Sequence, residues 1–448
     1  MTLYLYPTDW LFLASVLALL TYFFRLRHDR QMRERWRQVL RTPVAGAAAV
    51  VIGVYFAIGI LDSIHVANHA ARDSLLDLIL ASPKAHLETS YSAPLAMFGF
   101  VKESVAGAGS VQRDYPRLRF GGRHLIEPSQ RAADLVRRGA LGVALGGMVW
   151  LALIALVNGW RRGALFAPQT LRASLGSGPL IALGLSCACV GVMGGLAPYY
   201  HIFGTDKVGT DVLYQALKGV RTGLVLCTLT TMVTLPLALM LGLAAGFCRG
   251  WIDDVIQYLY TTIAAIPGVL LIAAAALTLD LQLAHWTTAA STEFRADLKL
   301  LALCSVLGLT GWTSLCRLLR AEALKLRSVE FVLAAQALGV RGSTIVWRHL
   351  LPNTLHLVII ATVLDFSSLV LAEAVLTYID IGVDPNMESW GNMINSARLD
   401  LAREPAVWWS LAAACTFMFV LVLAANLLAD AVRDAFDPRT ATSPNEHA

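Results

Sequence analysis

The chain has 448 residues, of which 56% are hydrophobic and only 15% are charged, and its formal net charge is +5. A soluble domain usually carries about 25% charged residues, so this composition excludes an ordinary soluble protein and indicates a polytopic membrane protein. The basic residues lie in short segments between apolar runs, without the basic-aromatic pattern of a nucleic-acid surface, so no nucleic-acid partner is predicted.

About nine apolar runs are long enough to span a bilayer. Pro7 and Asp9 interrupt the first run, which therefore has the weakest signal, and it has no small-residue cleavage site of the kind that ends a signal peptide. The predicted fold is all-α and polytopic, with spans near residues 4–24, 44–61, 139–157, 179–198, 221–246, 263–280, 299–319, 354–377 and 407–430.

Lysine and arginine in short loops predict the orientation of the spans, because such loops stay in the cytoplasm. The segment between the first two runs carries seven arginines: Arg25, Arg27, Arg30, Arg33, Arg35, Arg37 and Arg41. Arg161 and Arg162 follow two spans later and predict a second cytoplasmic loop. Alternation over an odd number of spans then predicts a periplasmic N-terminus and a cytoplasmic C-terminus, with the segment 317–353 inside.

One connection is much longer than the others. It runs near residues 62–138, and loops of this length do not obey the charge rule, so its arginines are compatible with an external location. We predict an N-terminal extension over 1–175, with about three spans and this external loop. A six-span core over 176–440 and a cytoplasmic tail over 441–448 follow.

The segment EFVLAAQALGVRGSTIVWRHLLPN, residues 330–353, is polar and basic between two long apolar runs. Ser328 is placed to act as an N-cap for a short helix. Helical spacing puts four apolar side chains of that helix on one face: Phe331, Val332, Ala335 and Leu338.

The end of this short helix also has a recognisable pattern. Gly339 suits a C-cap in the left-handed conformation, and Pro352 biases Leu351 away from helix just before the next span. Ala334 and Ala335 are small enough to let a partner surface approach closely. Periodicity alone leaves two interpretations open, a helix–turn–helix that docks a partner and an ordinary basic cytoplasmic loop.

Other polar groups have a structural and a functional interpretation. HIFGTDKVGTDV, residues 201–212, suits a metal-binding turn, but local capping and turn geometry explain the same pattern better. Asp365 and Glu373 fall inside a predicted span, where carboxylates line a polar path or hydrogen-bond between helices. The seven cysteines lack metal-ligand spacing and are expected to be buried free thiols, so no metal site is predicted.

Several catalytic motifs are missing from the sequence. It contains no G-x-x-x-x-G-K-[ST] motif, and no G-x-S-x-G, H-E-x-x-H or Cys/His cluster. We therefore predict no catalytic residue, no enzymatic activity and no cofactor bound by this chain.

Residues 330–353 resemble the EAA loop of binding-protein-dependent ABC importer permeases, and more narrowly that of the dipeptide/oligopeptide/nickel permeases, E-Y-V-x-A-A-R-A-L-G…R-H-I-L-P-N. Gln336 replaces the frequent Arg of that pattern. Further resemblances to the same family, in the expected order over about 260 residues, lie at 201–212, 264–271, 308–324, 371–394 and 426–439. Within 201–212, Ile202 and Thr210 depart from the family's Pro and Arg.

This resemblance implies a six-helix type I ABC importer core and assigns roles to residues. The ATPase-docking residues would be Glu330, Ala334, Ala335, Ala337, Leu338, Gly339, Arg341, Arg348 and Pro352. The residues facing a binding protein would be His201, Asp206, Asp211, Trp390 and Asn392. The first 175 residues lie outside the resemblance.

The resemblance also implies partners and a substrate. The chain would be a bacterial inner-membrane permease for di- or oligopeptides, surrounded by lipid and paired with a second permease. Two ATPase subunits, which bind ATP and Mg, and an extracytoplasmic binding protein would complete the machine. Alternatives are the same machinery carrying nickel chelates or antimicrobial peptides, and an ATPase-independent secondary transporter, which would show paired interrupted helices and several mid-membrane charges.

Overall fold

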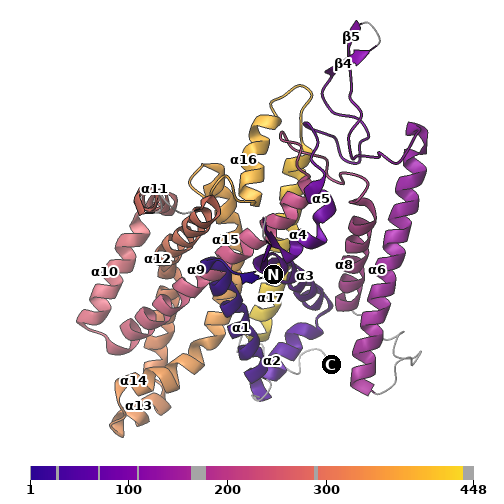
Figure 1. The fold of residues 1–448 in the computed structure, drawn as a ribbon. Helices are drawn as coiled ribbons and strands as arrows, with labels where there is room; N and C mark the ends of the chain where they lie inside the picture. Colours follow the sequence, from indigo (N-terminus) through magenta and orange to yellow (C-terminus); the bar gives the residue numbers. More distant parts are fainter. Residues whose placement is uncertain are drawn as a thin grey trace. The chain divides into compact units, whose positions relative to one another are not determined.

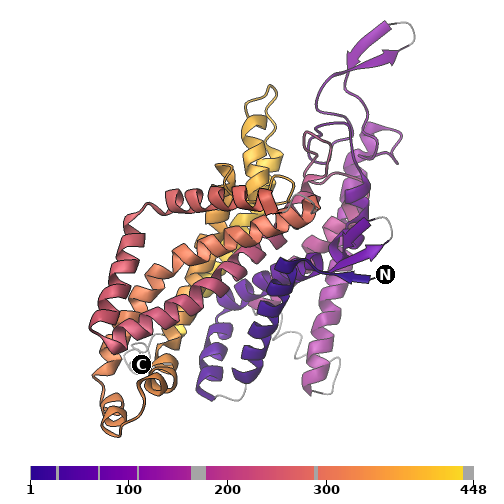
Figure 2. The same cartoon turned by 60° about the vertical axis from the view of Figure 1, so that its left-hand side comes forward.

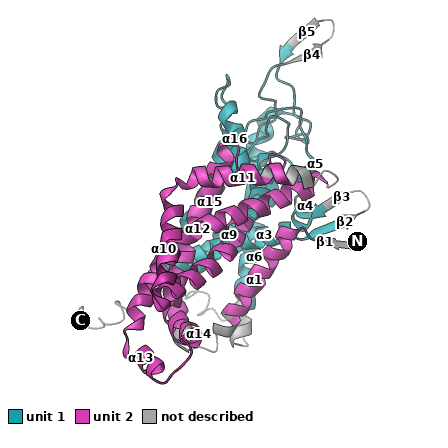
Figure 3. Cartoon of the chain, turned by 90° about the vertical axis from the view of Figure 1, so that its left-hand side faces the viewer, with its two compact units in different colours: residues 1–5, 40–223, 388–428 teal, residues 6–39, 224–387, 429–448 magenta. Residues whose placement is uncertain are grey.

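The computed structural model describes residues 2–26, 30–68, 71–107, 110–162, 178–286 and 291–436. These residues fall into two compact units, coloured separately in Figure 3: residues 1–5, 40–223 and 388–428 form unit 1, and residues 6–39, 224–387 and 429–448 form unit 2. The division does not follow the predicted boundary near residue 175, which lies outside the described residues.

Unit 1 combines long helices with short strands and turns (Figure 1). Its elements are β1 (Thr2–Tyr4), α3 (Pro43–Ser63), β2 (His65–Asn68), β3 (Ala71–Ser74), α4 (Leu75–Ile79), α5 (Ala81–Ala85), β4 (Glu103–Gly107), β5 (Ser110–Asp114), η1 (Pro128–Gln130), α6 (Arg131–Arg162), α8 (Gly178–Leu196), the start of α9 (Val212–Cys248), α16 (Trp390–Asp400) and most of α17 (Trp409–Phe436).

In the described part of unit 2, every regular element is a helix. It contains α1 (Pro7–Leu26), most of α2 (Arg30–Arg41) and α9, then α10 (Trp251–Ala265), α11 (Gly268–Trp286), α12 (Thr292–Arg327), α13 (Glu330–Ala337), α14 (Gly342–Ile345), a turn of π-helix (Val346–Leu350), α15 (Leu351–Tyr378) and the end of α17.

The prediction of a polytopic all-α protein is confirmed. Among the described residues, seven helices are long and apolar enough to cross a membrane: 43–63, 128–156, 178–196, 212–248, 292–327, 342–378 and 409–436. The predicted span at 263–280 becomes part of a pair, α10 and α11, bent by 91°. Pro267 explains the break, because it holds the preceding Ile266 in extended geometry at φ −87° and ψ 132°.

The first predicted span, 4–24, differs from the structure. Residues 2–4 form a strand that pairs antiparallel with β2, and the helix begins only at Pro7, leaving an apolar stretch from Pro7 to Tyr22. Asp9 accepts a hydrogen bond from the backbone N–H of Tyr6 at 3.3 Å, so this charge caps the helix start rather than interrupting a span.

Glycines bring α6 and α8 of unit 1 into close contact. A Cβ added to Gly142 would lie 2.5 Å from the carbonyl oxygen of Gly191, and one added to Gly146 would lie 2.3 Å from that of Cys187. These small residues recur every fourth position, the spacing that lets membrane helices pack backbone to backbone. The last helix of the extension, α6, is therefore packed tightly on α8, the first helix of the predicted core.

The long predicted loop contains regular structure. β1, β2 and β3 form an antiparallel sheet in that order, and β4 and β5 form a separate hairpin, which extends beyond the helices of unit 1 in Figure 2. Ser74 and Asp77 form a reciprocal capping box that starts α4. α6 begins at Arg131, before the predicted end of the loop at residue 138.

Buried apolar side chains of α9, α10, α12 and α15 form the centre of unit 2. The cluster consists of Ala238, Ala245, Ile256, Tyr260, Trp312, Leu315, Cys316, Leu319 and Val358. Arg320 adds a polar contact at its edge, donating from its Nε to Asp253 at 2.5 Å and from Nη2 at 2.9 Å. Unit 2 thus offers a rigid support for the short helices that follow α12.

Candidate functional site

The segment between α12 and α15 projects one face of α13 to the outside. Glu330, Ala334, Ala337 and Leu338 are exposed and lie on the same side of the helix, and Leu338 is 83% exposed. Figures 1 and 2 show α13 and α14 at one end of the long helices of unit 2. Phe331 and Leu333 of the same short helix are exposed as well, at 42% and 50%, so apolar side chains are grouped on α13.

The predicted apolar face of this helix is partly wrong. Val332 and Ala335 are buried, whereas Phe331 and Leu338 are 42% and 83% exposed. Val332 and Ala335 pack inward against Leu243, Ala323, Ile345 and Leu350. Of the two small residues expected to let a partner approach, Ala334 is exposed, whereas Ala335 is buried in this cluster.

The end of α13 is fixed by a Schellman motif. Gly339 has φ +73°, which costs glycine nothing and a residue with a Cβ considerably more. The N–H of Val340 donates to the carbonyl of Ala335 at 3.1 Å, and the N–H of Gly339 donates to Gln336 at 3.0 Å. The prediction for Gly339 as a helix end is therefore confirmed, and the turn after it has one defined shape.

Two other predicted boundaries of this segment differ. Val329, not Ser328, occupies the N-cap of α13, and Ser328 ends α12 with its hydroxyl donating to the carbonyl of Lys325 at 2.8 Å. Leu351 is helical at φ −54° and ψ −47°, because Pro352 lies in the first turn of α15, where its missing N–H is tolerated. Pro352, Arg341 and Arg348 are exposed.

Contacts with the ends of α9 and α12 hold the base of this segment. Arg327 donates from Nη1 to the carbonyl of Phe247 at 3.0 Å, and its guanidinium lies 6.0 Å from the centre of that ring. Phe247 also packs against the same buried cluster as Val332. α13 is therefore packed on the ends of α9 and α12.

The two carboxylates of α15 lie in different environments. Glu373 is 1% exposed and accepts a hydrogen bond from the hydroxyl of Thr377 at 3.2 Å. Asp365 is exposed on the chain, and its backbone carbonyl accepts a hydrogen bond from Ser368 at 2.8 Å. Glu373 therefore has a hydrogen-bond partner within its own helix, whereas the side chain of Asp365 is exposed on the outside of this chain.

His201 lies between two carboxylates at the start of the 201–212 segment. Its Nδ1 lies 2.7 Å from Asp211 and its Nε2 lies 3.4 Å from Glu88, and all three side chains are buried in unit 1. Burial lowers the pKa of His201, but its contacts with the two carboxylates, Asp211 and Glu88, together outweigh burial and raise the pKa to about 9. The imidazolium is therefore the form that this site holds at neutral pH.

The acidic residues of this segment act mainly as caps. Asp211 accepts from the N–H groups of Leu213 and Tyr214 at 2.8 and 3.3 Å, at the start of α9. Asp206 accepts from the N–H groups of Val208 and Thr210, both at 2.9 Å. Local capping, the interpretation preferred over a metal site, is confirmed for both carboxylates.

Glu88 is a residue that the sequence patterns did not single out. Its carboxylate accepts three backbone N–H groups, from Arg119 at 2.9 Å, Phe120 at 2.8 Å and Gly121 at 3.3 Å. Burial raises its pKa, but His201 and these N–H groups outweigh burial and lower the pKa to about 2. The role of Glu88 becomes visible only in the folded chain, where its segment lies against His201 and residues 119–121.

Backbone contacts join the long segment after α3 to the 201–212 turn. Glu88 donates its N–H to the carbonyl of Gly209 at 3.0 Å, and Leu95 donates to that of His201 at 2.8 Å. A Cβ on Gly209, which has φ +81°, would meet the Glu88 carbonyl at 2.0 Å. Thr205 accepts from the N–H of Ser92 at 2.7 Å. Residues of the extension therefore cover this turn of the core.

A charged contact ties the same extension to α9. Lys218 lies 2.9 Å from Asp62 and 3.0 Å from Asp77. Burial raises the pKa of Asp77, but the charge and hydrogen bond of Lys218, together with hydrogen bonds from Ser74 and Lys84, outweigh burial and lower the pKa to about 2. Removing Lys218 would leave two nearly buried carboxylates close together. The two ion pairs of Lys218 therefore hold α3 and α4 against the start of α9.

The residues predicted to face a binding protein are mostly buried. Trp390 is 1% exposed, and its Nε1 donates to the carbonyl of Ala216 at 2.9 Å. Asn392 is half-buried at the start of α16, where its N–H donates to Ser389. His201 and Asp211 are buried as well, so the exposed side chains beside them are Lys207 and Val208.

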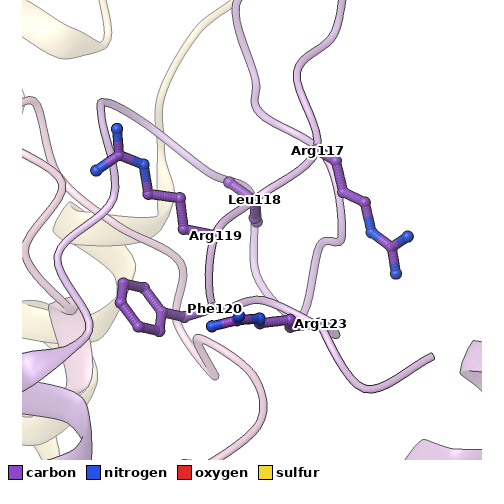
Figure 4. Close-up of a pocket in the computed structure, with 5 residues that line it drawn as sticks. All are labelled: Arg117, Leu118, Arg119, Phe120 and Arg123. Carbon is purple, nitrogen blue, oxygen red and sulfur yellow. The ribbon is translucent and has the colours of Figure 1, made fainter. Parts of the chain in front are cut away.

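A hollow of about 500 Å³ lies on the long segment of unit 1, lined by Arg117, Leu118, Arg119, Phe120 and Arg123. Arg117 is held by the carbonyl oxygens of Gly122 and Leu125. Figure 4 shows the side chains of Arg117 and Arg119 pointing in different directions. The hollow therefore lacks the converging charges that a small anion would require.

No group of three metal-ligating side chains occurs among the described residues. All seven cysteines are free; Cys227, Cys304 and Cys316 are buried, whereas Cys189, Cys248 and Cys415 are exposed on this chain. The expectation of buried thiols is thus correct for only part of the set.

Comparison with known proteins identifies the family. The family model described as "binding-protein-dependent transport system inner membrane component" matches residues 238–442. The glutathione transport system permease protein GsiD of Pectobacterium atrosepticum is 30% identical over 241 residues, which cover 53% of this chain and 73% of the relative. The chain belongs to the family of binding-protein-dependent permeases.

Other relatives of this permease carry related names. The oligopeptide transport system permease protein OppC of Bacillus subtilis is 26% identical over 239 residues, 53% of this chain and 72% of the relative. The dipeptide transport system permease protein DppC of Alkalihalophilus pseudofirmus is 31% identical over 239 residues, which cover 53% of this chain and 72% of the relative. As a member of this family, the permease is an inner-membrane subunit of an ABC importer.

Proposed function

We propose that this permease forms a path for di- or oligopeptides and is driven by ATPase subunits that dock on α13 and α14. The names of the relatives, which include oligopeptide, dipeptide and glutathione permeases, support a peptide-like substrate. The complete importer would contain a second permease, two ATPase subunits that bind ATP and Mg, and an extracytoplasmic binding protein.

The exposed face of α13 is the observation that carries this proposal. Leu338 is 83% exposed, yet the backbone on both sides of it is fixed by the Schellman motif and by the buried Val332 and Ala335. A rigid apolar side chain with nothing covering it suits a partner that arrives as a folded surface. Ala334 and Ala337 beside it add no bulk, so a partner can approach the helix closely.

Coupling between the partner and the path would be mechanical. α12 has 36 residues and α15 has 28, and both pack against the segment that lies between them. Closure of an ATPase pair would move α13 and α14 and tilt these helices as rigid bodies. The chain itself would position and move spans, with no covalent chemistry.

We propose a periplasmic N-terminus and a cytoplasmic C-terminus. α1 has 20 residues, enough to cross about 30 Å of hydrocarbon, and together with the seven long helices and the bent α10–α11 pair it gives nine crossings. This orientation places α13 and α14 in the cytoplasm with the ATPase subunits. Reporter tags at the two ends would test it, and reporters on the same side would contradict it.

A pair of matched substitutions tests the docking face. Leu338→Glu puts a charge at the centre of the proposed contact, and we expect it to weaken ATPase co-purification about 30-fold, the effect of losing about 2 kcal/mol at an interface hot spot. Ile126→Glu is the control, because Ile126 is 89% exposed and lies before α6 in unit 1.

Both variants would be compared for membrane insertion, ATPase co-purification and peptide uptake. The proposal predicts normal insertion for both and loss of the last two only for Leu338→Glu. Full co-purification and uptake by Leu338→Glu would show that the ATPase docks elsewhere.

A further inference from the structure

The basic helix α2 has an exposed stripe of arginines. Residues 30–41 contain five arginines and a single carboxylate, that of Glu34. Arg33, Arg37 and Arg41 are all exposed, and their spacing of four residues places them along the same side of the helix. None of these three arginines belongs to the proposed docking face or to the proposed path.

The opposite side of α2 is packed against unit 2. Val39 is 1% exposed, and the ring of Trp36 meets the fully buried ring of Phe436 edge to face at 5.7 Å between centroids. The guanidinium of Arg35 lies 5.6 Å from the centre of the Phe436 ring, and its Nη1 donates to the carbonyl of Phe436 at 3.5 Å. α2 is thus amphipathic, with its aromatic side fixed on the end of α17.

Chain connectivity places the basic stripe at the membrane surface. Only Thr42 separates Arg41, the last residue of α2, from Pro43, the first residue of α3. α3 is one of the long apolar helices and contains no lysine or arginine. A helix that ends where a span begins must lie in the headgroup region, within reach of lipid phosphates.

We propose that α2 binds the headgroups of anionic phospholipids through Arg33, Arg37 and Arg41. The charge of the stripe matches that of the lipid, and Leu40, which is 50% exposed next to Arg41, can enter the boundary between headgroups and acyl chains. Because Trp36 and Arg35 hold Phe436, bound lipid would stabilise the end of the last helix of the core.

The test measures binding of a fluorescent phosphatidylglycerol to the purified full-length chain in micelles of a neutral detergent. The triple variant Arg33→Gln/Arg37→Gln/Arg41→Gln should bind about 100-fold more weakly. Raising the ionic strength should weaken binding to the wild-type chain, because the interaction is between exposed charges. The Arg→Lys triple variant keeps the charge and should retain binding within a few fold.

Two controls separate this site from general charge effects. Arg113→Gln/Arg119→Gln/Arg123→Gln removes the same charge from exposed positions of unit 1 and should leave binding unchanged. Fluorescent phosphatidylcholine should bind the wild-type chain at least tenfold more weakly than phosphatidylglycerol. A protease-accessible C-terminal tag on each variant confirms equal insertion.

Three results of these binding comparisons would overturn the proposal. They are unchanged phosphatidylglycerol binding by the α2 glutamine variant, an equal loss in the unit 1 control, and equal binding of phosphatidylcholine. Glycerol phosphate at the same concentration should not compete, and full competition would assign the stripe to a free phosphate anion instead of a lipid.

Discussion

Two single residues determine local structure, His201 in the buried charged cluster of unit 1 and Gly339 at the end of α13 in unit 2. His201 lies between Asp211 and Glu88, and its charge offsets two carboxylates that would otherwise be buried together. Gly339 supplies the positive φ that lets α13 end and the chain turn toward α14. The sequence predicted the role of Gly339 because its cause is local, but Glu88 lies 113 residues before His201 and no local pattern joins them.

The first prediction concerns the pH dependence of the His201 contact. The pKa of His201 is raised from its ordinary 6.5 to about 9 in the folded protein, so its stabilisation is complete below about pH 6.5 and is lost as the pH rises through about 9. His201→Ala should lower the free energy of unfolding by about 3 kcal/mol at pH 6. Thermal unfolding in detergent at pH 6 and pH 10 measures this difference, which should shrink at the higher pH.

A constant difference between wild type and His201→Ala over that pH range would show that the imidazole acts by packing alone. Glu88 stays ionised throughout, because its pKa is about 2, so it adds no transition of its own between these pH values.

The second prediction concerns Gly339. Gly339→Val should destabilise the end of α13 by about 1–2 kcal/mol, because a residue with a Cβ is strained at φ +73°. Gly339→Asn is the matched control, since asparagine tolerates this conformation. The measurement is co-purification of the ATPase from membranes, which should be lost with Gly339→Val and retained with Gly339→Asn. Equal co-purification with the two variants would show that the turn at Gly339 does not contribute to docking.

Elements show which parts of the fold can be predicted from sequence. Long helices such as α9 and α15 are visible in the sequence because most of their residues are apolar over at least the length of a membrane span, and their order was predicted correctly. The strand β1 and the regular structure after α3 were not predicted, because their short segments are stabilised by pairing with distant residues. Leu351 was misjudged because Pro352 is tolerated in a first helical turn.

The third prediction concerns the α6–α8 helix pair. Gly146→Leu should destabilise the protein by about 1–3 kcal/mol, because its Cβ would meet the carbonyl of Cys187 at 2.3 Å. Gly147→Leu is the neighbouring control, with nothing within 4 Å of an added Cβ. Thermal unfolding in detergent should separate the two variants; a lower midpoint for Gly147→Leu than for Gly146→Leu would contradict close packing of α6 on α8.

At the scale of the whole molecule, the two units each combine residues of the extension with residues of the core. In unit 1, Glu88 and Asp77 of the extension contact His201 and Lys218. In unit 2, Thr8 at the start of α1 donates its N–H to Asp297 of α12 at 3.2 Å. The extension is therefore integrated into the fold, and we expect its removal to destabilise the permease.

The central claim is that this chain transports peptide only when ATPase subunits act on it. The most direct measurement is ATP hydrolysis by the reconstituted importer, with the second permease, the ATPases and the binding protein, in the presence and absence of peptide. The account predicts that peptide stimulates hydrolysis and that Leu338→Glu abolishes this stimulation. Peptide uptake into vesicles that contain the permeases but no ATPase would contradict it and indicate a secondary transporter.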